Sequence, residues 1–294
     1  MSTLFHVVDR DDARVRRMAV PFIETGYRLP STSVWDCLFT GVCRCHNETA
    51  CVHSHLWPAG YLFCLACTSL FNTLPELIGP SWRVSERLAW FYFFFSAVLC
   101  FASSAVFHSL LSHDDDGVRH LAHRIDYIGI QNFIGATNVL AFFLGFECFP
   151  LWQTLYLAIS ITLLVVGVGL QVFGNWAAPA FRRHRLILFA ASALLGVLPL
   201  LQWKFVLTGG RASDTTVFGD IVWFYAYFGS AFAFFISRWP ERTFRRWPLV
   251  DLCFSSHLWW HIFTAVAAIH FAHSVLRFRE YRADFGCSQE LVNG

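Results

Sequence analysis

Two histidines, His257 and His261, stand four residues apart near the start of the last apolar segment of the chain. This spacing puts both imidazoles on one face of a helix, as in the His-x-x-x-His part of metalloprotease zinc motifs. Imidazole nitrogen is a common ligand of Zn²⁺ in proteins. The pair therefore predicts a metal site whose other ligands come from elsewhere in the chain.

Further polar residues stand within apolar segments, where ionisable side chains are costly and mark functional sites. His108 lies near the end of the second segment, one helical turn after Ser104, and Asp126 lies near the start of the third. If the second segment ends on the membrane face where the third and seventh begin, all of these residues share one depth. We therefore predict a zinc site in which His108, His257 and His261 are the ligands.

Three imidazole ligands leave the fourth tetrahedral position to water, which is typical of a catalytic rather than a structural zinc site. Zinc lowers the pKa of its bound water to about 7, which gives a hydroxide nucleophile at neutral pH. Asp126 would accept a proton from that water or orient it, and Ser104 would bond a ligand or a substrate carbonyl. Two alternatives stay open: a membrane histidine often only packs, and serine often bonds its own backbone.

The elements that must position these residues are long apolar stretches. A span needs about 20 apolar residues, and seven stretches qualify, at roughly 56–78, 88–112, 123–146, 149–173, 186–207, 217–237 and 252–275. Of the 294 residues, 56% are hydrophobic and only 14% are charged, which is typical of a membrane protein. The net charge of +2 gives no indication of a nucleic-acid partner.

The sequence thus predicts an all-α fold, a bundle of seven transmembrane helices. Residues 1–55 would form a cytoplasmic N-terminal arm and juxtamembrane segment, residues 56–275 the helix domain with its intramembrane zinc site, and residues 276–294 a short tail. Most Arg residues fall in the arm and in the second, fourth and sixth connections. Because cytoplasmic loops are enriched in Arg and Lys, we expect the N-terminus in the cytoplasm and the C-terminus outside.

The ten cysteines do not form the pattern of a secreted disulfide framework, since several lie in apolar runs where a thiol acts as a small hydrophobe. A second zinc site in the arm is an alternative, although its residues have no fixed spacing motif; they are Cys43, Cys45, His46, Cys51, His53 and His55. His270 and His273 lie further along the last apolar stretch and are expected near the opposite membrane surface.

At these residues the chain resembles the progestin and adipoQ receptor family, which includes the adiponectin receptors and is related to haemolysin III. The resemblance rests on motifs in the family's order: Gly26-Tyr27-Arg28, His46-Asn47-Glu48-Thr49, Ser54-His55-Leu56, Ser104-x-x-x-His108, Asp126-Tyr127-x-Gly129-Ile130, Pro240-Glu241-Arg242 and Ser256-His257-x-x-x-His261. Cys51, His53, Phe254 and Leu258 depart from the family's usual residues, so the subfamily stays open.

The resemblance implies seven helices with the N-terminus inside, zinc held by His108, His257 and His261, and Asp126 and Ser104 beside the bound water. It also implies two functions. One is zinc-dependent hydrolysis of a lipid amide of the ceramide type. The other is ligand sensing, with an extracellular protein or a steroid as ligand and a structural zinc ion. The location would be the plasma membrane or the endoplasmic reticulum.

Overall fold

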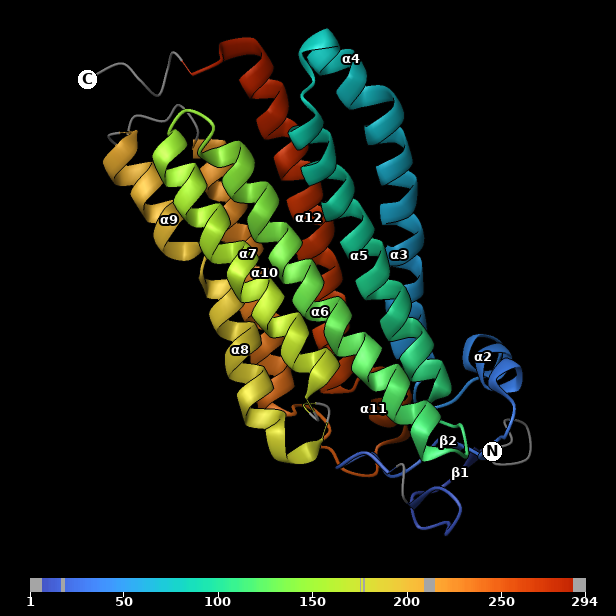
Figure 1. Cartoon of the computed structure of the whole chain (residues 1–294). Coiled ribbons are helices and arrows are strands. Elements are labelled where there is room, and N and C mark those ends of the chain that lie inside the picture. The colour runs from blue at the N-terminus through green and yellow to red at the C-terminus, as the bar shows by residue number, and fades with distance from the viewer. Residues whose placement is uncertain (1–6, 17–18, 175, 177, 209–214, 288–294) are drawn as a thin grey trace. The chain divides into compact units, whose positions relative to one another are not determined.

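The structure is a computed structural model that describes residues 7–16, 19–174, 176, 178–208 and 215–287. Residues 1–6 and 17–18 of the predicted arm and residues 288–294 of the predicted tail lie outside this part of the chain. Seven helical segments within it are long and apolar enough to cross a membrane: Thr49–Ile78, Val84–Leu110, Asp116–Gly145, Pro150–Phe173, Arg182–Leu207, Val217–Ser237 and Pro248–Asp284. The predicted all-α fold with seven membrane-spanning helices is confirmed (Figure 1).

The helices follow the chain in a simple order. The long α-helices are α3 (Thr49–Thr68), α5 (Val84–Leu110), α6 (Asp116–Gly145), α7 (Pro150–Phe173), α10 (Thr215–Ser237) and α12 (Ser256–Phe285). The first span continues from α3 through a π-helical turn (Ser69–Thr73) into α4 (Leu74–Ile78). The fifth span is broken into α8 (Arg182–Leu194), α9 (Val197–Leu201) and a π-helical turn (Gln202–Leu207). The first and last helices extend beyond the predicted spans, because polar residues at their ends have partners inside the protein.

The chain forms two compact units, and each is described here by itself. The first unit comprises Met1–Ala59, Phe101–Asp126 and Tyr225–Ala267, and the second comprises Gly60–Cys100, Tyr127–Phe224 and Ala268–Gly294. The first unit contains the arm and all of the residues predicted for the zinc site.

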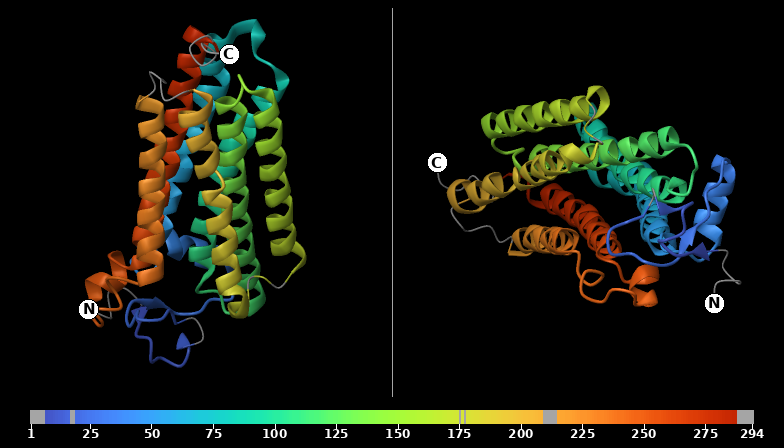
Figure 2. Two further views of the ribbon diagram at one scale, coloured as in Figure 1. Left: turned by 90° about the vertical axis from the view of Figure 1, so that its left-hand side faces the viewer. Right: turned by 90° about the horizontal axis from the view of Figure 1, so that it is seen from below.

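In the first unit, two short strands pair as an antiparallel ribbon. Strand β1 (Val7–Val8) pairs with β2 (Tyr27–Arg28), with Val7 opposite Arg28 and Val8 opposite Tyr27. Tyr27 packs in a small apolar cluster with Val15 and Ile23. Figure 2 shows this N-terminal segment, in blue, lying across the ends of the helices of the unit. The arm is thus a folded part of the first unit.

The short helix α2 (Val34–Cys43) joins the arm to the helix ends. Its N-terminus is capped by Ser33, whose hydroxyl accepts a hydrogen bond from the Asp36 N–H, as is usual for an N-cap serine. Cys37 packs against Leu110 and Ala122 at the α5–α6 connection. On the other side of the unit, the carboxylate of Asp251 in α11 (Pro248–Cys253) accepts hydrogen bonds from the backbone N–H groups of two arm residues at 3.2 and 3.0 Å. The arm is therefore tied down at both sides.

In the second unit, small and polar residues allow the helices to approach closely. A Cβ atom at Gly167 of α7 would lie 2.6 Å from the Gln131 side chain of α6, and one at Gly135 would lie 2.7 Å from Leu164. Close backbone approach at glycine is the usual basis of helix association in membranes. Gln131 and Asn138 of α6 both hydrogen-bond Ser192 of α8, at 3.3 and 2.8 Å.

The second unit also contains a disulfide that the sequence did not predict. Cys148, between α6 and α7, is bonded to Cys287, which follows α12. Two arginines of the last turns of α12 lie in ion pairs, Arg277 with Asp220 at 2.7 Å and Arg279 with Glu86 at 2.6 Å. These partners explain why α12 continues as a helix to Phe285, past the predicted end of the span at residue 275.

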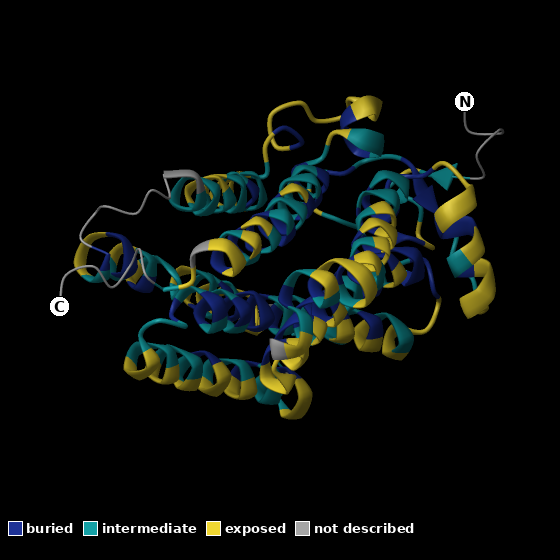
Figure 3. Ribbon diagram, turned by 90° about the horizontal axis from the view of Figure 1, so that it is seen from above, coloured by how far each residue is buried: buried dark blue, intermediate teal, exposed yellow. Residues whose placement is uncertain are grey.

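Large apolar side chains remain exposed along the helices. Figure 3 shows exposed residues in yellow and buried residues in dark blue alternating along individual helices. On α7 the exposed residues include Leu151, Val165 and Phe173, at 78%, 64% and 90% of full exposure. Soluble monomers rarely expose apolar patches of this extent, so these faces are suited to lipid.

Candidate metal centre

Three histidines of the first unit converge on one point. His257 and His261 lie in the first turns of α12, and His108 lies near the C-terminal end of α5. One ring nitrogen from each falls within a mutual distance of 4.8 Å. His108 Nε2 and His257 Nε2 are 3.2 Å apart. Two nitrogens that bind one tetrahedral zinc ion at about 2.0–2.1 Å lie about 3.3 Å apart, so this spacing fits a shared ion.

The imidazole rings of His108 and His261 are oriented by hydrogen bonds on their outer nitrogens. His108 Nδ1 lies 2.8 Å from Glu48 Oε2, and His261 Nδ1 lies 3.2 Å from the Cys51 carbonyl oxygen. A carboxylate and a carbonyl can only accept hydrogen bonds, so both Nδ1 atoms carry the proton. The lone pair is then on Nε2 in each ring, which is the form that binds a metal ion.

Asp126 and Ser104 form the neighbouring group. Both residues are buried, at 7% and 3% exposure. The Ser104 side chain hydrogen-bonds the Asp126 carboxylate, which is also close enough to His108 for electrostatic attraction. The other carboxylate oxygen, Asp126 Oδ1, has no hydrogen-bond partner among the residues that the structure describes. A buried carboxylate oxygen without a partner is costly, and a water or ligand at the centre would satisfy it.

Arg28 fixes the end of α5 that carries His108. Its guanidinium is buried and donates to the carbonyl oxygens of His108 and Ser109, at 3.1 and 2.8 Å, and to the Cys37 carbonyl at 2.9 Å. These carbonyls belong to the last turn of α5 and to α2, and the α5 carbonyls lack helical partners. Arg28 therefore links the arm, α2 and the metal centre.

The surroundings of Glu48 and His46 determine the charge state of each side chain. Burial raises the pKa of Glu48, but the hydrogen bond from His108 and the nearby histidines outweigh burial and leave the pKa below its ordinary value. Burial, together with the charge of Arg28, lowers the pKa of His46 to about 3. Glu48 is therefore an anion and His46 is a neutral imidazole at physiological pH.

The histidines considered for a second zinc site in the arm make other contacts. His46 Nε2 bonds the Gly41 carbonyl at 3.2 Å, and His53 Nε2 bonds the Val42 carbonyl at 3.0 Å. His55 stacks on His261 with ring centroids 3.6 Å apart. Cys43 and Cys45 are exposed, and neither belongs to the possible metal-binding groups found among the described residues.

A second possible metal-binding group shares a residue with the first. Its members are Glu48, Cys51 and His108. Because Glu48 faces the Nδ1 atom of His108, this group lies on the outer side of the ring. Sequence reasoning gave Glu48 and Arg28 no role at the site, although both stand in the quoted motifs. The sequence feature that could have indicated a role for Glu48 is its place as a glutamate in a polar segment directly before the first span.

Comparison with known proteins gives one consistent result. A sequence profile of the family described as Haemolysin-III related matches residues 43–272. Heptahelical transmembrane protein 1 of Arabidopsis thaliana is 28% identical over 87% of this chain and 76% of its own length. Progestin and adipoQ receptor family member 3 of Homo sapiens is 27% identical over 91% and 84%. Adiponectin receptor protein of Drosophila melanogaster is 25% identical over 89% and 57%.

Proposed function

Because this chain belongs to the haemolysin-III-related family, together with the progestin and adipoQ receptors, we propose that it is an intramembrane zinc hydrolase that cleaves a lipid amide of the ceramide type. His108, His257 and His261 are the zinc ligands, Asp126 is the proton acceptor and Ser104 supports Asp126. The observation that carries the proposal is the convergence of three imidazoles, together with the buried Asp126 close to His108, whose Oδ1 atom has no hydrogen-bond partner among the described residues.

The donor set supports zinc rather than an alkaline-earth ion. Neutral imidazoles suit Zn²⁺, whereas Ca²⁺ and Mg²⁺ prefer oxygen ligands. Three protein ligands leave one tetrahedral position open. When bound there, zinc supplies Lewis-acid polarisation and lowers the pKa of a coordinated water to about 7.

The protein's own residues provide the remaining requirements of amide hydrolysis. Asp126 Oδ1 takes up a proton from the attacking water, and the Ser104 hydrogen bond holds the carboxylate in place. The oxygen of the water bonds to the acyl carbon, the C–N bond breaks, and the leaving amine receives the proton. The products are a fatty acid and a sphingoid base.

Aromatic side chains beside the centre suit a lipid substrate. The Phe235 ring lies 6.0 Å from the His257 ring and 5.2 Å from the Trp260 ring, and Phe232 packs against Trp260 at 5.2 Å between centroids. Burying an acyl chain against such rings is favourable at about 25 cal/mol per Å². An apolar substrate could therefore reach the histidines without crossing water.

The test is hydrolysis of ceramide by the purified full-length chain in detergent or lipid nanodiscs. Fatty-acid release should occur with zinc-loaded protein, stop after chelation and return when zinc is added back. Release that is unaffected by the chelator, or no release from zinc-loaded protein above a protein-free control, would contradict the proposal.

A second candidate is a ligand-sensing receptor in which the zinc ion is structural. The names of the relatives favour it, since two of the three compared above are called receptors. In this case an extracellular protein or a steroid would change the helix packing, and chelation would lower stability without removing a hydrolytic activity. The ceramide assay separates the two functions.

A further inference from the structure

Glu48 stands outside the membrane-spanning segments but reaches the metal centre. It lies directly before α3, which begins at Thr49. Its Oε2 atom is 2.8 Å from His108 Nδ1, and the two side chains are 14% and 3% exposed. Glu48 is thus an acidic partner of a histidine in the convergent group.

The geometry excludes Glu48 as a ligand of the ion that the three histidines would share. The two nitrogens of an imidazole point away from each other on opposite sides of the ring. His108 Nε2 faces His257, whereas Glu48 faces Nδ1. A carboxylate in this position fixes the tautomer and raises the basicity of the metal-binding nitrogen.

The backbone around Glu48 is fixed by its neighbours in sequence. The Glu48 N–H donates to His46 Nδ1 at 3.0 Å, and the opposite nitrogen of His46 bonds the Gly41 carbonyl of α2. The Asn47 N–H donates to the Gly26 carbonyl at 2.9 Å. Gly26 has a φ of +84°, and a Cβ there would lie 3.2 Å from the Asn47 nitrogen. The loop that carries Glu48 is therefore held by both α2 and the arm.

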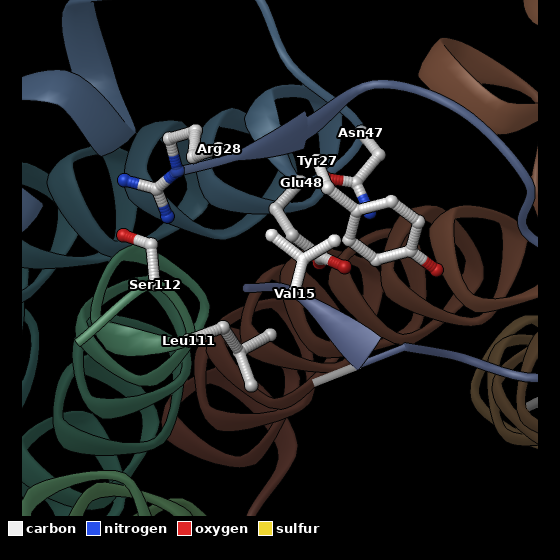
Figure 4. Close-up of a pocket in the computed structure, with 7 residues that line it drawn as sticks. All are labelled: Val15, Tyr27, Arg28, Asn47, Glu48, Leu111 and Ser112. Atoms are coloured by element: carbon white, nitrogen blue, oxygen red, sulfur yellow. The ribbon is translucent and has the colours of Figure 1, made fainter. Parts of the chain in front are cut away.

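A small pocket lies over Glu48. Figure 4 shows Glu48 and Arg28 at this pocket, which is also lined by Val15 and Tyr27 of the arm and by Leu111 and Ser112 after α5. All of the lining residues belong to the first unit. The arm thus forms one wall of the space next to the carboxylate, and none of the three convergent histidines lines this pocket.

We propose that Glu48 is a positioning residue of the metal centre, which holds His108 with its proton on Nδ1 and its Nε2 lone pair toward the ion. The inference rests on the proposed metal site but not on the proposed reaction. The arm and α2 contribute by fixing the loop of Glu48. A segment before the first span thereby sets the metal affinity of a site built on α5 and α12.

The experiment measures zinc affinity by competition with a chromophoric chelator, without substrate, on the purified full-length chain. Glu48→Leu removes the acceptor, and Glu48→Gln keeps a neutral one. Loss of an outer partner of a metal-binding histidine typically weakens affinity about 10–100-fold. We expect a loss in this range for Glu48→Leu and a smaller loss for Glu48→Gln.

Glu86→Gln is the matched control, because Glu86 is a buried glutamate of the second unit whose carboxylate pairs with Arg279 at 2.6 Å. Its zinc affinity should equal that of the wild type. The d–d absorption of Co²⁺ in place of zinc should change for both Glu48 variants and not for Glu86→Gln, which a merely structural role would not produce.

Wild-type zinc affinity in both Glu48 variants would overturn the inference, and so would an equal loss in Glu86→Gln. If Glu48→Leu does not fold, Glu48→Gln alone decides the result through its affinity and Co²⁺ spectrum. If wild-type protein binds zinc but hydrolyses no ceramide, the proposed reaction is wrong. The role of Glu48 is then decided by the zinc affinities alone.

Discussion

At the scale of single residues, the metal centre is defined by which ring nitrogen each histidine turns inward. Glu48 and the Cys51 carbonyl occupy the Nδ1 atoms of His108 and His261, so Nε2 is left for an ion. His257 shares a face of α12 with His261, and their ring centroids are 4.5 Å apart. Removing two of the three imidazoles should therefore remove the metal.

We predict that purified wild-type protein contains about one zinc ion per chain and that the double variant His257→Ala, His261→Ala contains almost none. Elemental analysis of both proteins after gel filtration is the measurement. His270→Ala is the control, because His270 lies on the same helix but bonds the Asp220 carbonyl in the second unit. Full zinc retention in the double variant would end the metal assignment.

The spacing of His257 and His261 was enough to predict that they share a helix face, and matching depth was enough to add His108, which offers a ring nitrogen within 4.8 Å of theirs. The role of Asp126 stays a prediction. Glu48 could not be predicted in the same way, because its contact joins residues 60 positions apart. Which nitrogen of a histidine faces a neighbour depends on side-chain rotation, which the periodicity of the sequence does not indicate.

At the scale of helices and loops, the position of the start of α12 matters because it carries two of the three convergent histidines. The carboxylate of Glu241, which is buried, accepts a hydrogen bond from the Ser256 N–H at 2.7 Å and another from the Ser256 hydroxyl. This is a side-chain cap of a helix N-terminus, where unpaired N–H groups and the helix dipole favour an anion. The residue after the capped position is His257.

We expect Glu241→Ala to destabilise the protein by about 1–3 kcal/mol, because the capped N–H loses a buried partner. In a chain of this size each kcal/mol lowers the melting temperature by roughly 2–4 °C. Thermal unfolding in detergent is the measurement. Glu24→Ala is the control, since the Arg10–Glu24 pair is partly exposed at 38% and 28% and such pairs contribute little. Equal melting temperatures for wild type and Glu241→Ala would contradict the capping role.

Hydropathy predicted the seven spans well because each contains a long run of apolar residues, whether these residues are exposed or buried inside the protein. It missed the first turns of α3, where Thr49 and His53 are polar but have partners at Arg44 and Val42. It also missed α2 as a separate element, because ten residues are too few to register as a span. A hydropathy average does not register the hydrogen bonds that satisfy polar side chains in the folded protein.

At the scale of the whole molecule, two independent features agree on the orientation. Arg residues concentrate in the arm and in alternate connections, which favours a cytoplasmic N-terminus. Cys148 and Cys287 follow the third and seventh spans, so they lie on the same side of the membrane and opposite to the N-terminus. Disulfides persist on the non-cytoplasmic side. The pairing could not be predicted from the sequence, since ten cysteines allow many connectivities.

We therefore predict that an epitope tag after Gly294 is accessible in intact cells and that a tag before Met1 becomes accessible only after permeabilisation. If the protein resides in an internal membrane, selective permeabilisation of the plasma membrane exposes only the N-terminal tag. An N-terminal tag on the non-cytoplasmic side, with a C-terminal tag in the cytoplasm, would overturn the orientation.

If the molecule uses the convergent histidines for hydrolysis, the variant Asp126→Asn should lose ceramide hydrolysis while keeping zinc. The substitution keeps the size of the side chain and its bond to Ser104 but removes the proton-accepting charge. Fatty-acid release from ceramide is measured for wild type, Asp126→Asn and the control Asp220→Asn at matched zinc content. Asp220 is an aspartate of another span, paired with Arg277.

General acid–base groups contribute roughly 10²–10⁴-fold to rate. We predict a loss of about that factor for Asp126→Asn, with zinc retained and helices folded, and near wild-type release for Asp220→Asn. Equal release by wild type and Asp126→Asn would contradict the role of Asp126. No release by zinc-loaded wild type would contradict the hydrolase itself and favour the receptor with a structural zinc ion.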